Sequence, residues 1–101
     1  MTPGYTLSRA AATDLASIYR YTRREFGKLQ AERYLAALVS ALDLIADHPL
    51  IGAEKHEFTP TARMHPHDHH VILYRIEAGR PHIVRIVAGR QRWQTLLSGQ
   101  A

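Results

Sequence analysis

Residues 70–88, which read HVILYRIEAGRPHIVRIVA, decide the fold. Residues 70–76 and 82–88 are rich in β-branched and aromatic side chains, the types that favour β-strands. Between these two runs, the stretch EAGRP places Gly79 and Pro81 close together, which is typical of a turn. The whole segment therefore predicts an antiparallel β-hairpin.

Both faces of this predicted hairpin are largely apolar. In the first strand, alternation separates His70, Ile72, Tyr74 and Ile76 from Val71, Leu73 and Arg75. In the second strand, it separates Val84 and Ile86 from Ile83, Arg85 and Val87. Strands that are apolar on both sides are normally covered on both sides. We expect a partner outside the chain to cover one face, marked by Arg75 and Arg85. The alternative is that residues 49–63 and the C-terminal tail fold over it.

Two amphipathic helices precede the hairpin. The first has apolar positions at helical spacing, namely Ala11, Leu15, Ile18, Thr22 and Phe26. Ser8 is its predicted N-cap and Gly27 its predicted end. The second runs from about residue 29 to 47 and ends before Pro49. Its stripe consists of Ala31, Tyr34, Leu35, Leu38, Leu42 and Ile45, widened by Val39, Leu44 and Ala46. Residues 8–48 thus predict a helical hairpin whose aromatic and leucine side chains pack in the core.

The remaining segments give weaker signals. Tyr5 and Leu7 alternate with polar residues and predict a short first strand. Residues 49–63 carry two prolines and a glycine, and predict a long surface connection. Residues 62–65 are a candidate for another short strand. The helical hairpin then covers about residues 8–48, the sheet lies mostly within 62–88, and residues 89–101 form a tail.

Composition limits the class of protein. The chain has 101 residues and no cysteine, so it predicts one domain, spanning 1–101, without disulfides or thiolate metal sites. Hydrophobic residues make up 46% and charged residues 22%, values typical of a globular domain. No apolar run approaches the roughly 18 residues of a membrane span, and residues 1–10 lack the apolar core of a signal peptide. These features predict a cytoplasmic protein that does not enter membranes.

Positive charge is concentrated near the C-terminus. Lys and Arg number 13 against 9 Asp and Glu, a formal net charge of +4. Residues 1–62 sum to zero, so the excess lies in residues 63–101. Arginine, which pairs in a bidentate manner with carboxylate and phosphate, supplies most of the cations. The C-terminal part therefore predicts an acidic protein or a nucleic acid as partner, the alternative being a solvated basic face.

A histidine run at residues 65–70, HPHDHH, is the most conspicuous candidate for chemistry. Four imidazoles and a carboxylate are of the type that ligates zinc. However, Asp68 follows His65 by three positions, whereas the metallo-hydrolase pattern His-x-His-x-Asp-His needs four. We therefore expect no metal and no cofactor here, and interpret the run as polar turn residues or as a pH-sensitive element.

No other segment offers catalytic machinery. The sequence shows no persuasive serine nucleophile, no paired carboxylates in the basic part and no glycine-rich phosphate loop. Acid–base catalysis by arginine and histidine on a nucleic acid is the one enzymatic interpretation left.

The tail combines arginine with the single tryptophan. Arg90 and Arg92 flank Trp93, a composition typical of interface hot spots and of base stacking. The alternative is that Trp93, Leu96 and Leu97 dock the tail onto the core.

Taken together, these segments resemble the RelE/ParE toxin superfamily, and its ParE branch in particular. The resemblance covers about residues 5–97 and rests on the helical hairpin ending in LIADHPLIG, on RMHPHDHHVILYRI, and on HIVRIVAGRQR. It implies an α+β fold, with the helical hairpin packed on a small twisted antiparallel sheet. It also implies a type II toxin whose cognate antitoxin wraps an acidic and apolar C-terminal segment over it. ParE-type toxins inhibit DNA gyrase by trapping it on cleaved DNA, and they are not catalysts.

The RelE branch, which cuts mRNA on the ribosome, is the alternative. By position, its catalytic arginines, tyrosine and lysines are replaced here by Val71, Gln91, Leu97, Ala62 and Met64. Valine and leucine neither stabilise a phosphorane nor transfer a proton, although a shift of one residue would bring Arg90 or Arg92 into place. A non-toxic antitoxin-binding module is the third interpretation.

These interpretations assign two sets of binding residues. The predicted gyrase-binding residues are Arg90, Arg92 and Trp93. The predicted antitoxin-binding residues are Arg63, Arg75, Arg85, Val71 and Leu73. We expect a hetero-oligomer with the antitoxin.

Overall fold

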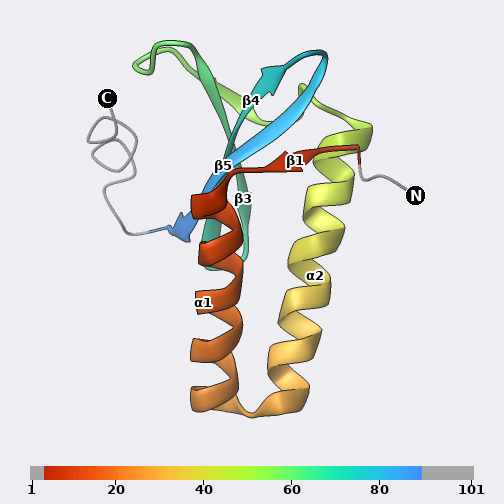
Figure 1. Ribbon diagram of the computed structural model, residues 1–101, viewed down its shortest axis with the longest axis vertical. Helices are drawn as coiled ribbons and strands as arrows, with labels where there is room; N and C mark the ends of the chain where they lie inside the picture. The colour runs from red at the N-terminus through yellow and green to blue at the C-terminus, as the bar shows by residue number, and fades with distance from the viewer. Residues whose placement is uncertain (1–3, 90–101) are drawn as a thin grey trace.

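Two helices cover one face of a five-stranded sheet in this computed structural model, which describes residues 4–89 (Figure 1). The elements are β1 (Thr6–Leu7), α1 (Arg9–Phe26), α2 (Lys28–Asp47), β2 (Ala53–Lys55), β3 (Ala62–His67), β4 (His70–Glu77) and β5 (Arg80–Ala88). Strand order is β1-β5-β4-β3-β2. The predicted α+β fold and the β4–β5 hairpin are confirmed. The sheet is mixed rather than purely antiparallel, because β1 pairs in parallel with β5.

A bulge in β5 corrects the predicted faces of that strand. Leu73 is opposite Arg85 and Tyr74 is opposite Ile83, so Val84 is an extra residue in the ladder. An extra residue reverses the alternation beyond it. Ile83 and Ile86 therefore both pack in the core under the helices, whereas simple alternation placed them on opposite faces. The predicted division of β4 is confirmed, with Ile72 and Tyr74 under the helices and Val71 and Leu73 on the other face.

Ser8 joins the start of α1 to β5. Its hydroxyl accepts a hydrogen bond from the Ala11 amide at 2.9 Å, which confirms the predicted N-cap. The same hydroxyl donates to the Val84 carbonyl at 2.7 Å, and the Ser8 amide donates to the Ile83 carbonyl at 2.9 Å. At the other end of α1, Gly27 adopts a φ of 91°, a conformation that favours glycine, and the chain turns directly into α2. The predicted helical hairpin is thus confirmed.

The connection between α2 and β3 differs from its prediction in two ways. Residues Ala53–Lys55 form the edge strand β2, although their sequence carries no strand pattern. Phe58, from the same connection, is buried against Ala62, Leu73 and Val87 on the sheet face away from the helices. Part of the second face is therefore covered by the chain itself, so the expectation that an outside partner covers this face is wrong for that part.

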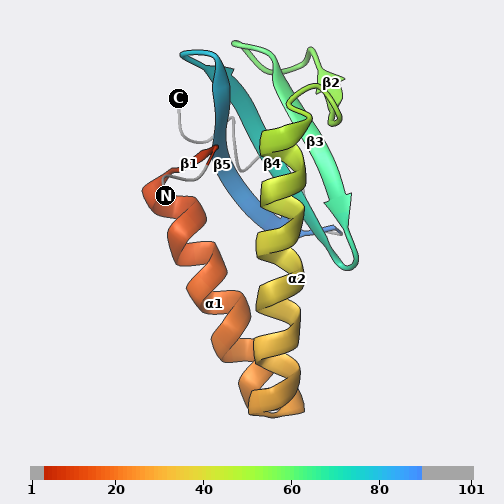
Figure 2. The same ribbon diagram turned by 90° about the vertical axis from the view of Figure 1, so that its right-hand side faces the viewer.

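The tip of the helical hairpin projects beyond the sheet. Figures 1 and 2 both show the turn between α1 and α2 well below the nearest strand. Apolar side chains near this tip are exposed because no strand lies beneath them; Phe26 is 66% and Leu29 62% exposed. The prediction that Phe26 packs in the core is therefore wrong. Farther along α2, Val39 and Leu44 are also exposed rather than part of the buried stripe.

Candidate docking groove

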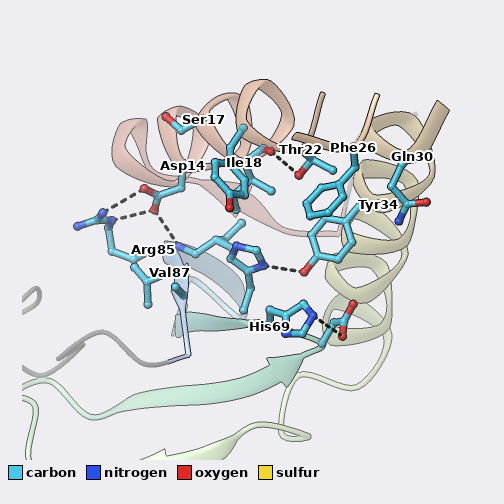
Figure 3. Close-up of a pocket in the computed structure, with 15 residues that line it drawn as sticks. Asp14, Ser17, Ile18, Thr22, Phe26, Gln30, Tyr34, His69, Arg85 and Val87 are labelled. Atoms are coloured by element: carbon cyan, nitrogen blue, oxygen red, sulfur yellow. Dashed lines mark hydrogen bonds and ion pairs between the residues drawn. The ribbon is translucent and has the colours of Figure 1, made fainter. Parts of the chain in front are cut away.

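A groove of about 860 Å³ lies between the helical hairpin and the end of the sheet (Figure 3). Its walls come from both helices, the β3–β4 turn and β5. The lining residues are Asp14, Ser17, Ile18, Tyr21, Thr22, Phe26, Gln30, Tyr34, Asp68, His69, His70, Arg85, Ile86, Val87 and Ala88. We call this site the groove. Its apolar side chains and its few polar groups are typical of a surface that receives a partner.

Asp14 of α1 fixes one end of the groove to β5. Its carboxylate accepts two hydrogen bonds from the Arg85 guanidinium, at 2.8 and 3.0 Å. It also accepts a third bond from the backbone amide of Ile86 at 2.9 Å. The side chains of Arg85 and Asp14 are only 19% and 14% exposed, and hydrogen bonding to Asp14 raises the pKa of Arg85. Figure 3 shows this pair at one side of the groove.

The outer edge of β5 is only partly occupied. The two-residue strand β1 pairs with His82 and Ile83 alone. Ser8 bonds the Val84 carbonyl and Asp14 bonds the Ile86 amide. Within residues 4–89, no strand pairs with β5 on this side beyond Ile83. Because Asp14 already holds the Ile86 amide, the edge left for an added strand runs from the Ile86 carbonyl to Ala88.

A tyrosine–histidine cluster forms the other end of the groove. The Tyr34 hydroxyl and His70 Nδ1 are hydrogen-bonded at 2.6 Å, and the ring of Tyr34 lies 6.0 Å from that of His67 between centroids. Burial, and then the neighbouring His69, lower the pKa of His70. Burial, and then the charge of Asp68, raise the pKa of Tyr34. An unprotonated His70 Nδ1 accepts the bond from the Tyr34 hydroxyl.

The histidine run does not form a metal site in the part of the chain that the structure describes. Among residues 4–89, no three His, Asp or Glu side chains are placed to hold a metal ion. His65, His67 and His70 belong to β3 and β4 on the face toward the helices, whereas Asp68 and His69 form the turn and pair with one another at 3.7 Å.

Of the three predicted antitoxin-binding arginines, only Arg85 lines the groove. Arg63 lies at the other end of the sheet, where it donates to the carbonyls of Leu50 and Gly52 at 3.1 and 2.8 Å. Arg75 donates to the Pro60 carbonyl at 3.1 Å. Arg63 and Arg75 thus support the connection between α2 and β3, and the structure does not bring the three arginines together.

The other predicted binding residues divide in two groups. Val71 and Leu73 are 7% and 0% exposed, and they pack with Phe58 and Val87. Their burial leaves them little surface for a partner. Arg90, Arg92 and Trp93 lie outside the described residues, which end at Gly89.

Sequence reasoning missed Asp14 and Tyr21 as groove residues. Both lie on the flank of α1, beside its buried stripe, so hydrophobic periodicity gave them no role. One signal was present in the sequence: Asp14 is the single carboxylate within residues 1–24, on a helix otherwise rich in arginine.

Sequence comparisons point to one family of proteins. A family model described as "ParE toxin of type II toxin-antitoxin system, parDE" matches residues 5–93. Toxin ParE of Escherichia coli is 36% identical over 80 residues, which cover 79% of this chain and 78% of that toxin. Toxin ParE1 of Caulobacter vibrioides is 32% identical over 83 residues, covering 82% and 85% respectively. Toxin ParE1 of Mycobacterium tuberculosis is 35% identical over 91 residues, covering 89% and 93%.

A solved structure shares the fold. The chain superposes with a TM-score of 0.71 on a chain of the structure titled "Chromosomal ParDE TA system from P. aeruginosa". The match covers 83% of this chain and 92% of the other at 21% sequence identity, so it supports the architecture alone. Separately, neither helix described here is long and apolar enough to cross a membrane.

Proposed function

We propose that this chain, which belongs to the ParE toxin family of type II toxin–antitoxin systems, inhibits DNA gyrase by trapping it on cleaved DNA until an antitoxin binds. The family assignment makes the chain the toxin component of such a system. The gyrase target and the site of neutralisation are the proposed parts.

The groove is the observation that supports the proposed site of antitoxin binding. It combines exposed apolar side chains, Tyr21 and Phe26 among them, with the edge of β5 at Ile86–Ala88. A peptide segment of alternating apolar and polar residues matches both features. Its backbone pairs with the β5 edge, and its apolar side chains contact the flank of α1. An antitoxin segment in this position contacts both helices and the sheet at once.

Within this proposal, Arg85 keeps its predicted role in antitoxin binding. It borders the groove, and an acidic antitoxin side chain can share its guanidinium with Asp14. Arg63 and Arg75 receive a supporting role instead, because both bond backbone carbonyls of the preceding connection. We retain Arg90, Arg92 and Trp93 as the proposed gyrase contact on their sequence alone.

A gyrase cleavage assay tests the target. Purified protein, DNA gyrase, ATP and supercoiled plasmid are mixed, denatured and treated with protease before electrophoresis. The proposal predicts linear plasmid that increases with the dose of toxin and disappears when the cognate antitoxin is added first. Combined Arg92→Ala and Trp93→Ala should abolish the linear product while antitoxin binding is retained.

Two results would overturn the proposed target. Undisturbed supercoiling with folded protein, together with cleavage of mRNA on ribosomes, would make the chain a nuclease of the RelE type. Undisturbed supercoiling without mRNA cleavage or toxicity on expression would make it an antitoxin-binding module. Full activity of the Arg92→Ala, Trp93→Ala variant would remove the tail from the proposed gyrase contact.

A further inference from the structure

The tip of the helical hairpin, residues 20–33, is strongly basic. It holds five cations against two carboxylates, the cations being Arg20, Arg23, Arg24, Lys28 and Arg33. All five are exposed. Each of the two carboxylates forms an ion pair with a tip cation: Glu25 pairs with Arg24 at 3.3 Å, and Glu32 pairs with Lys28 at 3.9 Å. Among residues 4–89, no carboxylate forms an ion pair with Arg20, Arg23 or Arg33.

The fold separates this charge from its compensation. Over residues 1–62 the charges sum to zero because the carboxylates Asp43, Asp47, Glu54 and Glu57 balance the tip. In the folded protein these four lie at the end of α2, on β2 and just beyond it. Figures 1 and 2 show this region at the end of the molecule opposite the tip. The far end also holds cations, with Lys55 on β2 and Arg63 paired with Glu54 at 3.4 Å, so its charge is mixed. The tip, in contrast, is predominantly positive and is the part of the molecule that attracts a polyanion.

The arginines of α1 point away from the rest of the protein. Arg20, Arg23 and Arg24 are spaced by one, three and four residues and all lie on the side of α1 opposite its buried residues Ala11 and Thr22. Between Arg9 and these three arginines, that side is made of small residues, such as Thr13 and Ala16. A membrane-binding helix instead pairs its basic face with a free bulky apolar face. In α1, Leu15 and Ile18 pack against the core, and the exposed Tyr21 and Phe26 line the groove proposed for the antitoxin.

We propose that the hairpin tip binds the phosphate backbone of duplex DNA. Arginine matches phosphate through bidentate hydrogen bonds, and the tip presents several such groups in a compact, projecting shape. Contacts of this kind carry no sequence information, so binding should be independent of DNA sequence. The inference rests on the proposed function in one respect, since gyrase bound to cleaved DNA is where the toxin would meet a duplex. The tip would then contact DNA while another surface contacts gyrase.

Direct DNA binding, measured without gyrase, tests the inference separately from the target. A short fluorescein-labelled duplex of mixed sequence is titrated with toxin, and anisotropy is followed over a range of KCl concentrations. The test variant carries Arg20→Gln and Arg23→Gln. The matched control carries Arg9→Gln and Arg80→Gln, which are also exposed and remove the same charge away from the tip. Circular dichroism and antitoxin binding establish that each variant is folded.

The tip variant should bind DNA about tenfold more weakly than the wild type at moderate salt. Its slope of log K against log[KCl] should fall by about 2, roughly one unit for each lost phosphate contact. The control should keep nearly the full slope. A second duplex of unrelated sequence should give the same affinities.

Several outcomes would overturn the inference. Equal weakening of test and control variants would mean that net charge alone is responsible. Loss of binding only on Arg90→Gln and Arg92→Gln would place the DNA contact in the tail. Weaker binding of the tip variant to DNA-free gyrase, with DNA affinity unchanged, would assign the tip to an acidic protein surface. These assays measure DNA affinity in the absence of gyrase. Their results therefore test the tip even if the gyrase cleavage assay shows that gyrase is not the target.

Discussion

Asp14 and Arg85, 71 positions apart in the chain, form a bidentate ion pair that connects α1 to β5. The same carboxylate receives the Ile86 amide at 2.9 Å. The Asp14 carboxylate therefore accepts hydrogen bonds from both the Arg85 guanidinium and the Ile86 amide, at a part of the β5 edge that β1 does not cover.

Replacing Asp14→Ala should destabilise the protein. The substitution leaves the largely buried guanidinium of Arg85 and the Ile86 amide without their acceptor, which should lower the free energy of unfolding by about 3 kcal/mol. Urea unfolding measures the loss. Glu32→Ala is the control, because it removes an exposed carboxylate paired with Lys28 at 3.9 Å and should cost less than about 0.5 kcal/mol. Similar losses for the two variants would contradict the role given to Asp14.

Tyr74→Phe should also destabilise the fold. The fully buried Tyr74 hydroxyl accepts from the Gly52 amide at 2.9 Å and donates to the Pro49 carbonyl at 2.7 Å. Phenylalanine keeps the ring in the core but leaves both backbone groups without a partner, at a cost of about 1–3 kcal/mol. Thermal unfolding provides the measurement. The exposed Tyr21→Phe serves as control, and an unchanged melting temperature for Tyr74→Phe would contradict the prediction.

Phe26→Ser should weaken antitoxin binding without affecting stability. Phe26 is 66% exposed and lines the groove, so its ring contributes little to the folded core but offers apolar surface to a partner. We expect the dissociation constant for the antitoxin to rise about tenfold or more by calorimetry. Leu29→Ser is a close control, since Leu29 is 62% exposed on the same hairpin but does not line the groove. If both variants bind equally well, the antitoxin does not use the groove.

Stability should decline in mild acid. Burial lowers the pKa values of His65 and His70 in the folded protein. The unfolded chain therefore takes up protons first, and folded-state stability falls as pH decreases through the ordinary histidine value of about 6.5. The loss stops below the folded pKa values. Denaturation between about pH 7.5 and 5.5 should show a smaller decline for His65→Gln with His70→Gln than for His56→Gln, whose side chain is 75% exposed. Equal declines would contradict this assignment.

Most of the fold could be predicted from local signals. Ser8, Gly27 and the apolar spacing of α1 and α2 predicted the helical hairpin, and residues 70–88 predicted the strands that follow it. The bulge at Val84 could not be predicted, because alternation alone does not show where a strand gains a residue. Nor could β2, whose residues Ala53–Lys55 pair with β3 only through tertiary packing.

The candidate site was much harder to predict than the fold. Arg85 was identified by its charge, but its partner Asp14 lies on a distant helix, and sequence offers no measure of that proximity. Phe26 fitted the apolar stripe of α1, yet the helix continues past the sheet that would have buried it. The net charge of zero over residues 1–62 likewise concealed the basic hairpin tip. The carboxylates that offset the tip in this sum lie at the opposite end of the folded protein.

The connection from Ser8 and Asp14 to β5 also bears on how the protein is made. A ribosome produces α1 long before residues 83–86. During synthesis, Ser8 and Asp14 therefore lack the β5 groups with which they form hydrogen bonds in the folded protein. The helical hairpin can form early, but the groove acquires its second wall only when β5 has emerged. A nascent chain therefore lacks this wall of the groove, so an antitoxin segment that binds there, as proposed, can dock only after β5 has been translated.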